Sequence, residues 1–106
     1  MPERKRLETA RALATRPKIL LLDEVMAGLR PTEIDQMVRA FSDLSRETGL
    51  AILLTEHVMR AVMALSHHIV VLHHGRKICE GTPDQVARDP AVLESYLGLS
   101  QAVPAP

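Results

Sequence analysis

The sequence predicts an α/β fold in which a parallel β-sheet is flanked by helices. Three short aliphatic runs, residues 19–22, 50–54 and 69–72, alternate with segments of helical periodicity. Apolar runs of this length are typical of strands buried on both faces, as in a parallel sheet. Strands that alternate with helices are joined by right-handed crossovers, which make the strands parallel. The 106 residues are enough for one small domain with one core.

Two helices are expected in the first half of the chain. The first covers residues 3–16 and ends before Pro17, because the residue that precedes a proline leaves the helical region. The second begins at Pro31, runs to about Arg46 and has Gly49 just past its end. Apolar residues recur at helical spacing in both: Leu7, Ala10, Leu13 and Ala14 in the first, and Ile34, Met37, Val38, Phe41 and Leu44 in the second.

The segment after the second strand predicts a third helix and a β-hairpin. The apolar stripe of the helix lies within residues 61–65. Residues 73–75, His-His-Gly, are typical of a tight turn, and residues 76–80 form a short returning strand that Gly81 ends. The last strand is therefore expected to run antiparallel to the one before it.

Two helices are expected to close the domain. Residues 82–85 match a capping box with a proline in the first turn. A second cap followed by proline, at residues 89–90, begins a last helix that runs through Leu97. We therefore expect one domain over residues 1–98 and a disordered tail over residues 99–106.

Composition excludes several classes of function. Lys+Arg and Asp+Glu are balanced at 13 each, so no basic field is present to gather nucleic acid. One Phe, one Tyr and no Trp leave few rings for base stacking. The single cysteine, Cys79, excludes an internal disulfide, fits a reducing compartment and is expected to be a buried, inert thiol. No apolar run approaches the roughly 20 residues of a membrane span, so direct membrane insertion is not expected.

Residues that can carry chemistry follow the first two strands. Asp23 and Glu24 come directly after the first strand, and His57 follows the second. The carboxyl ends of parallel strands meet at one edge of the sheet, where ligands bind in open α/β folds. One carboxylate can hold a metal ion through water while the other activates a nucleophilic water, and the imidazole can bind a terminal phosphate. The plain alternative is a strand end that only meets solvent.

Together with their neighbours, these residues resemble the ATP-hydrolysing subunit of ABC transporters. The aliphatic run that ends in Asp23-Glu24 resembles the Walker B motif of that family. The other matches are the D-loop at residues 27–31, the switch histidine at 55–57, the helix after the signature loop at 7–13, and the hairpin and domain end at 80–83. The ending, with residues 80–83, 89–90 and 94–98, most resembles the ATP-binding subunits of branched-chain amino acid importers.

The resemblance implies a role for each matching residue. Asp23 would hold Mg²⁺, Glu24 would polarise the attacking water and His57 would contact the γ-phosphate of ATP. Nucleotide binding would also involve Glu3, at the last position of the signature loop, and the D-loop residues Ala27, Gly28 and Leu29.

The resemblance also implies an assembly. The fold would be part of a P-loop NTPase-type sheet. The D-loop would reach a second ATPase subunit across a dimer interface, and permease subunits would hold the cytoplasmic protein at the inner face of a membrane. These partners, together with ATP and Mg²⁺, belong to a complete domain.

The sequence also departs from the family pattern. It contains no G-x-x-x-x-G-K-[ST] phosphate loop and no Q-loop. Met1-Pro2 stand where two glycines are expected, Val25 stands where the family usually has proline, and Arg30 stands where it has Asn or Asp. The chain is therefore expected to be the C-terminal part of an ABC ATPase, unable to bind or hydrolyse ATP alone. The alternative is a non-catalytic remnant that dimerises or interacts.

A receiver-like phosphoacceptor domain is a more distant alternative. It would use Asp23 as the acceptor, but it also needs an acidic pair on an earlier strand and a lysine at the end of a later one. The strand ends after Asp23 carry His57 and His73 instead. The pattern therefore favours the ATPase interpretation.

Other reactive residues are expected to have structural roles. Neighbouring residues in a strand point to opposite faces, so neither histidine pair, 67–68 or 73–74, can chelate a metal as a pair. The basic residues 4–6 are expected to be a solvated helix start. The methionines are expected to fill the core: Met26, Met37, Met59 and Met63.

Overall fold

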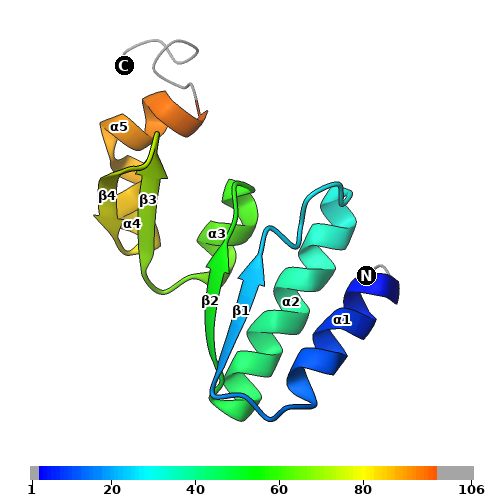
Figure 1. Cartoon of the computed structure of the whole chain (residues 1–106). Helices are drawn as coiled ribbons and strands as arrows, with labels where there is room; N and C mark the ends of the chain where they lie inside the picture. Colours follow the sequence, from blue (N-terminus) through cyan, green and yellow to red (C-terminus); the bar gives the residue numbers. More distant parts are fainter. Residues whose placement is uncertain (1–2, 98–106) are drawn as a thin grey trace. The chain divides into compact units, whose positions relative to one another are not determined.

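The computed structural model describes residues 3–97, and it divides the chain into two compact units between Leu65 and Ser66. The first unit contains three helices and a two-stranded parallel sheet, and the second contains an antiparallel hairpin followed by short helices (Figure 1). The predicted α/β class and the hairpin are confirmed. None of the described helices is long and apolar enough to cross a membrane.

The first unit is built around two parallel strands joined by a long helix. Its elements are α1 (Glu3–Leu13), β1 (Ile19–Asp23), α2 (Pro31–Thr48), β2 (Ala51–Thr55) and α3 (Met59–Leu65). The register pairs Ile19 with Ala51 at one end of the sheet and Asp23 with Thr55 at the other. Both strands therefore end at the same level, and the residues that follow them are neighbours.

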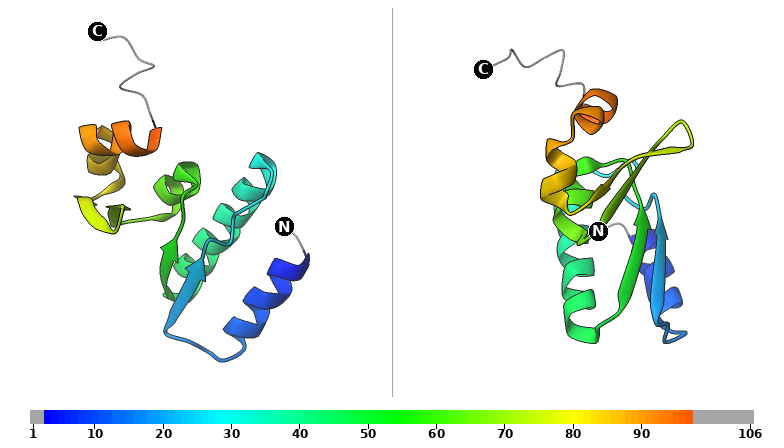
Figure 2. Two further views of the ribbon diagram at one scale, coloured as in Figure 1. Left: turned by 45° about the horizontal axis from the view of Figure 1, so that its top comes forward. Right: turned by 90° about the vertical axis from the view of Figure 1, so that its left-hand side faces the viewer.

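The hydrophobic core of the first unit lies between α2 and one face of the sheet, and Figure 2 shows α2 running beside the two strands. Leu20 and Leu22 of β1 are buried here, and the α2 stripe predicted from the sequence supplies Ile34, Met37 and Phe41. The predicted start at Pro31 and the predicted cap at Gly49, which has φ 71°, are confirmed, and the helix ends at Thr48 rather than at about Arg46. Burial of this stripe against the strands gives most of the stability of such a helix.

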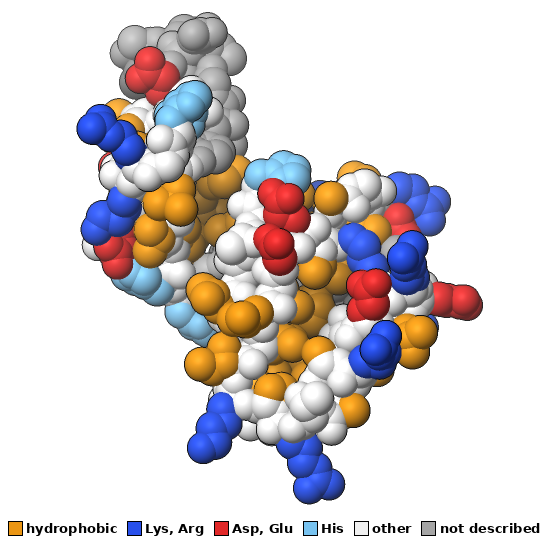
Figure 3. All heavy atoms as spheres, in the orientation of Figure 1, with side chains coloured by type: hydrophobic (Ala, Val, Ile, Leu, Met, Phe, Trp, Pro, Cys, Tyr) orange, Lys and Arg blue, Asp and Glu red, His pale blue; other side chains and the backbone are white. Residues whose placement is uncertain are grey.

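The opposite face of the sheet is open, so the prediction of strands buried on both faces is wrong for β1 and β2. Alternate residues of β1 and β2 point away from α2, and Leu21 is 69% and Leu53 62% exposed. Figure 3 shows apolar side chains spread over this face. A continuous aliphatic run is typical of a strand that is covered on both faces, and within the described residues only the face toward α2 is covered.

Helix α1 is shorter and less buried than predicted. It ends at Leu13 rather than Arg16, because Ala14 and Thr15 form a turn and Arg16 adopts a left-handed backbone with φ 52°. None of its residues is buried, and Leu7 of the predicted stripe is 62% exposed. The apolar stripe thus indicates that one face of α1 is suited to burial, but within the described residues this face is not buried.

The second unit is a hairpin closed by local contacts. It consists of β3 (Ile69–His73), β4 (Arg76–Gly81), α4 (Pro83–Arg88) and α5 (Pro90–Val92), which continues as a π-helix over Leu93–Leu97. His74 and Gly75 both have positive φ, at 51° and 74°, as a tight two-residue hairpin turn requires. Among the described residues β3 pairs with β4 alone, so the expected third strand of one parallel sheet belongs instead to a second, antiparallel sheet.

The helix starts of the second unit match the sequence signals. Thr82 Oγ1 accepts a hydrogen bond from the Gln85 backbone N–H at 3.3 Å, and the Gln85 side chain accepts one from Thr82 N–H at 2.9 Å. Asp89 Oδ1 caps the next helix through the N–H groups of Ala91 and Val92. The predicted end at Gly98 and the tail over 99–106 lie outside the described residues.

Candidate functional site

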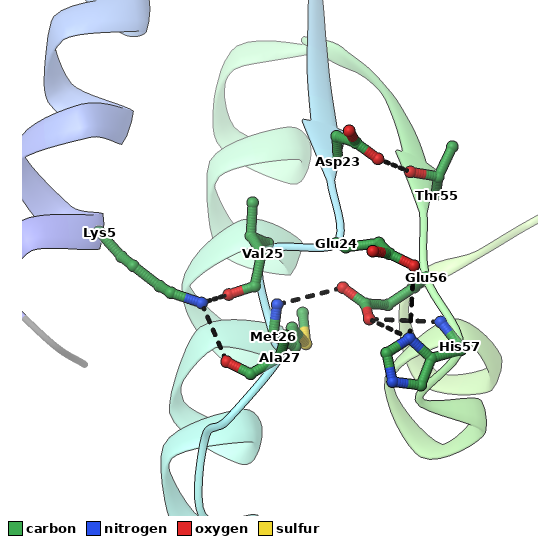
Figure 4. A network of polar contacts seen from close by, with 9 residues as sticks. All are labelled: Lys5, Asp23, Glu24, Val25, Met26, Ala27, Thr55, Glu56 and His57. Atoms are coloured by element: carbon green, nitrogen blue, oxygen red, sulfur yellow. Dashed lines mark hydrogen bonds and ion pairs between the residues drawn. The ribbon is translucent and has the colours of Figure 1, made fainter.

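The site predicted at the carboxyl ends of β1 and β2 is assembled from adjacent residues (Figure 4). Asp23 and Thr55 are paired in the sheet register, and the Thr55 hydroxyl donates to Asp23 Oδ1 at 2.6 Å. Both residues are exposed. The register of a parallel pair thus places the first candidate carboxylate at the open edge of the sheet.

Glu24 begins the turn that follows β1. Its backbone N–H donates to the Thr55 carbonyl at 2.9 Å, and its φ of 48° lies in the left-handed region, which costs a non-glycine residue about 1–2 kcal/mol. The Glu24 carboxylate, 60% exposed, lies 3.5 Å from His57 Nδ1. The turn therefore directs the second carboxylate toward the candidate histidine of the neighbouring strand.

Glu56 is a buried acid that the sequence reasoning did not single out. Its side chain is fully buried, and its carboxylate accepts from the Met26 backbone N–H at 3.1 Å and from the His57 backbone N–H at 3.3 Å. A carboxylate that accepts backbone N–H bonds is satisfied in spite of burial. Glu56 thus ties the turn after β1 to the turn after β2. The sequence feature that could have pointed to Glu56 is its position between the end of β2 and His57.

Lys5 also contacts the site, which corrects the expectation of a wholly solvated basic cluster at residues 4–6. Its Nζ donates to the carbonyl of Val25 and, at 3.4 Å, to the carbonyl of Ala27 (Figure 4). Arg4 behaves as expected: its side chain is 91% exposed and pairs with Glu8 on the same helix. Because the partners of Lys5 are backbone atoms 20 and 22 residues away, no sequence pattern indicated them.

The D-loop-like stretch forms the rest of the turn. Ala27 and Gly28 are exposed, Leu29 packs against the core cluster, and Gly28 has φ 76°, which favours glycine. Arg30, the cation unusual for this position, is bound to Glu33: its Nε donates to Glu33 Oε1 at 3.2 Å and its backbone N–H to the same oxygen at 3.1 Å. The hydrogen bonds from Arg30 hold the pKa of the Glu33 carboxyl below its usual value.

Glu3, the remaining candidate, is exposed at the start of α1. No group of three or more His, Cys, Asp or Glu side chains within residues 3–97 is placed to hold a metal ion. Asp23 nevertheless fits Mg²⁺, which prefers carboxylate oxygen and is often held by one or two carboxylates together with water and substrate phosphates. The exposed Asp23 carboxylate at the sheet edge provides such a ligand.

The reactive residues of the second unit have structural partners. His68 Nε2 lies 2.7 Å and Lys77 Nζ 2.9 Å from the Glu80 carboxylate, and the hydrogen bonds from Lys77 and His68 lower the pKa of Glu80 to about 2. The Cys79 thiol is half-buried, and burial, with Asp89 as a smaller cause, raises its pKa. A raised pKa makes the reactive thiolate scarce, although the thiol is only half-buried and not buried as expected.

Known proteins match both the sequence and the fold. The chain is 45% identical over 96 residues to the high-affinity branched-chain amino acid transport ATP-binding protein BraF of Pseudomonas aeruginosa, and 41% identical to LivG of Escherichia coli. The match covers 91% of this chain and 38% of each relative. This chain corresponds to the C-terminal portion of an ABC transporter ATP-binding subunit. It spans about two fifths of the length of these relatives.

Further matches support the same family. A family model of branched-chain amino acid ATP-binding cassette transporters matches residues 76–99 of this ABC subunit portion. A crystal structure of the ADP conformation of MJ1267, an ATP-binding cassette of an ABC transporter, superposes with a TM-score of 0.77 at 33% identity, covering 89% of this chain and 38% of that one. Structure and sequence therefore identify the same portion of the same family.

Proposed function

We propose that the chain is the part of an ABC transport ATPase that carries the metal-binding and water-activating residues. The observation that supports this most is the placement of Asp23, Glu24 and His57 at the ends of two hydrogen-bonded parallel strands, with Glu24 Oε1 3.5 Å from His57 Nδ1. The fold thus brings together side chains from two segments of the sequence, residues 23–24 and residue 57. The similarity to ABC transport ATP-binding proteins indicates ATP hydrolysis as the chemistry that this arrangement would perform.

Each residue of the proposed site has a distinct chemical task. Mg²⁺, when bound, would neutralise charge on the phosphates of ATP. Asp23 would hold the ion, directly or through water, with its carboxylate oriented by the Thr55 hydroxyl. Glu24 would accept a hydrogen bond from the attacking water or take its proton. His57, beside Glu24, would donate a hydrogen bond to the terminal phosphate.

The transported substrate we propose is a branched-chain amino acid. Identity alone does not decide this, because the chain is also 41% identical to the lipopolysaccharide export ATP-binding protein LptB of Haemophilus influenzae. The C-terminal segment favours an amino acid importer, since the family model that matches residues 76–99 is of the branched-chain type. A permease and a second ATPase subunit at the inner membrane face complete the proposed assembly.

A non-catalytic interaction module is the second candidate. The printed sequence contains no phosphate-binding loop, which in P-loop NTPases cradles the β- and γ-phosphates. We therefore expect the 106-residue chain to show no micromolar binding of Mg-ATP by calorimetry. A complete form, made by joining the upstream part of BraF to this chain, should bind. Micromolar binding by the chain alone would contradict this expectation.

The catalytic assignment is tested in that complete form by Glu24→Gln. The substitution keeps the size of the side chain and removes the carboxylate that acts on water, so turnover should fall by at least about 100-fold while nucleotide binding persists. His57→Ala should also slow hydrolysis. Glu47→Gln, an exposed acid of α2, is the control and should be neutral. Turnover near wild type in Glu24→Gln would show that the assignment is wrong.

A further inference from the structure

The turn between β1 and α2 has a support that the proposed mechanism does not use. This turn, residues 24–28, carries Glu24 in a left-handed backbone conformation. Its own backbone bonds are long: Ala27 N–H donates to the Glu24 carbonyl at 3.5 Å and Leu29 N–H to the Met26 carbonyl at 3.3 Å. A strained residue persists only when its surroundings over-determine the conformation. Contacts from outside must therefore hold the turn.

Those contacts come from two sides. From β2 and the residue after it, the Thr55 carbonyl accepts from Glu24 N–H, and the buried Glu56 carboxylate accepts from Met26 N–H. From α1, the Lys5 ammonium donates to the Val25 and Ala27 carbonyls. These four hydrogen bonds, made by three residues, involve different atoms of the same short turn. Lys5 alone among them belongs to a helix with no buried residue.

We infer that Lys5 is a positioning residue that couples helix α1 to the turn bearing Glu24. Its ammonium binds two carbonyls of the turn at once, which fixes the orientation of the Val25–Met26 and Ala27–Gly28 peptide groups. Hydrogen bonds from a charged donor are the stronger class. Lys5 also lines a groove between α1 and β1 together with Glu8, Asp23 and Glu24, so it lies on the side of the proposed site.

The functional consequence follows from how α1 is attached. No residue of α1 is fully buried, although Leu13 packs against the core cluster, and the Lys5 contact is a polar link through which a shift of this helix would reach the turn. The carboxylate of Glu24 would then move relative to His57, which is 3.5 Å away. This inference rests on the proposed function, since the position of Glu24 affects turnover only if Glu24 acts on the attacking water.

The first test measures the turn and not the activity. In the complete form, hydrogen exchange followed by mass spectrometry compares wild type with Lys5→Met, which keeps the aliphatic chain and removes the donor. Exchange in a peptide covering residues 24–29 should become roughly five-fold faster, the change expected for one net hydrogen bond. A peptide from α2 should be unchanged. Unchanged exchange over 24–29 in Lys5→Met would overturn the inference, whether or not the protein hydrolyses ATP.

Two further variants separate positioning from general destabilisation. Lys5→Arg retains a cationic donor and should restore the slow exchange, while Arg4→Met removes the neighbouring exposed cation and should change nothing. In turnover assays Lys5→Met should lower kcat and leave KM for ATP unchanged. Equal effects of Arg4→Met and Lys5→Met would contradict a specific role for Lys5. If Glu24→Gln proves active while Lys5→Met still loosens the turn, the proposed function fails and the contact stands.

Discussion

The paired strands of the two units are separated by very different lengths of chain. In the second unit, β3 and β4 are joined by a two-residue turn, so that His73 pairs with Arg76. In the first unit, Ile19 pairs with Ala51, and the long helix α2 lies between their strands. Loop closure costs more entropy for the longer connection. The parallel pair therefore depends on tertiary packing, whereas the hairpin depends mainly on local turn and cap geometry.

The largest effect is expected from loss of the α2 contact with the sheet. Phe41 is 1% exposed in the core of the first unit, and Phe41→Ala should destabilise this unit by about 3–5 kcal/mol. Hydrogen exchange should rise in peptides from α2 and the parallel strands, while peptides from the hairpin stay protected. Ser42→Ala, at the exposed neighbouring position, is the control. Simultaneous loss of protection in both units would show that they unfold together.

A second expectation concerns the open face of the parallel sheet. The exposed side chains of Leu21 and Leu53 make self-association of the isolated chain favourable. Size-exclusion chromatography with light scattering should show a mass that grows with concentration, and the double substitution Leu21→Lys, Leu53→Lys should reduce it.

The matched control lies in the hairpin, where Leu72 is 56% exposed. Leu72→Lys should leave the association largely unchanged. An equal reduction of the associated mass by Leu72→Lys would mean that the self-association is not specific to the open face of the parallel sheet. A sharp wild-type monomer at all concentrations would contradict the expectation altogether.

A smaller effect is expected from the helix cap of the second unit. Thr82→Ala removes the oxygen that accepts from the Gln85 N–H and should cost about 1 kcal/mol. Amide hydrogen exchange of the α4 residues, measured at increasing urea concentration, gives this loss of stability. Thr82→Ser retains the acceptor and should restore most of the stability. A cost near zero for Thr82→Ala would show that the cap is not needed once the hairpin has formed.

The smallest effect is expected from acidification of the hairpin. The pKa of Glu80 is lowered to about 2 by Lys77 and His68. A carboxyl group with a lowered pKa adds stability above its unfolded value, and this stability is lost as the pH falls from about 4.5 toward 2. The protection factors of the hairpin amides, which correct for the intrinsic pH dependence of exchange, should therefore fall over that range in wild type and much less in Glu80→Gln. Asp84→Asn, in the same unit, should behave like wild type.

Much of the second unit and of α2 was predictable because the signals are local. Pro31 and Gly49 marked the ends of α2, and the capping box at residues 82–85 marked the start of α4. Such signals depend only on residues that are neighbours in the sequence. The predicted end of α1, Arg16, lies three residues beyond the observed end, Leu13. The chain leaves the helical conformation before it reaches the residue that precedes Pro17.

The sequence by itself indicated the residues that we propose for the chemistry, namely Asp23, Glu24 and His57, because they lie just beyond the ends of two aliphatic runs. Only the tertiary structure decided what holds them. Glu56 reaches Met26 across 30 residues, and Lys5 reaches Val25 across 20, in both cases through backbone atoms that every residue possesses. A partner that is a backbone group leaves no mark on side-chain identity. Periodicity and motif spacing therefore point to the reacting groups, whereas the contacts that position them follow only from the folded chain.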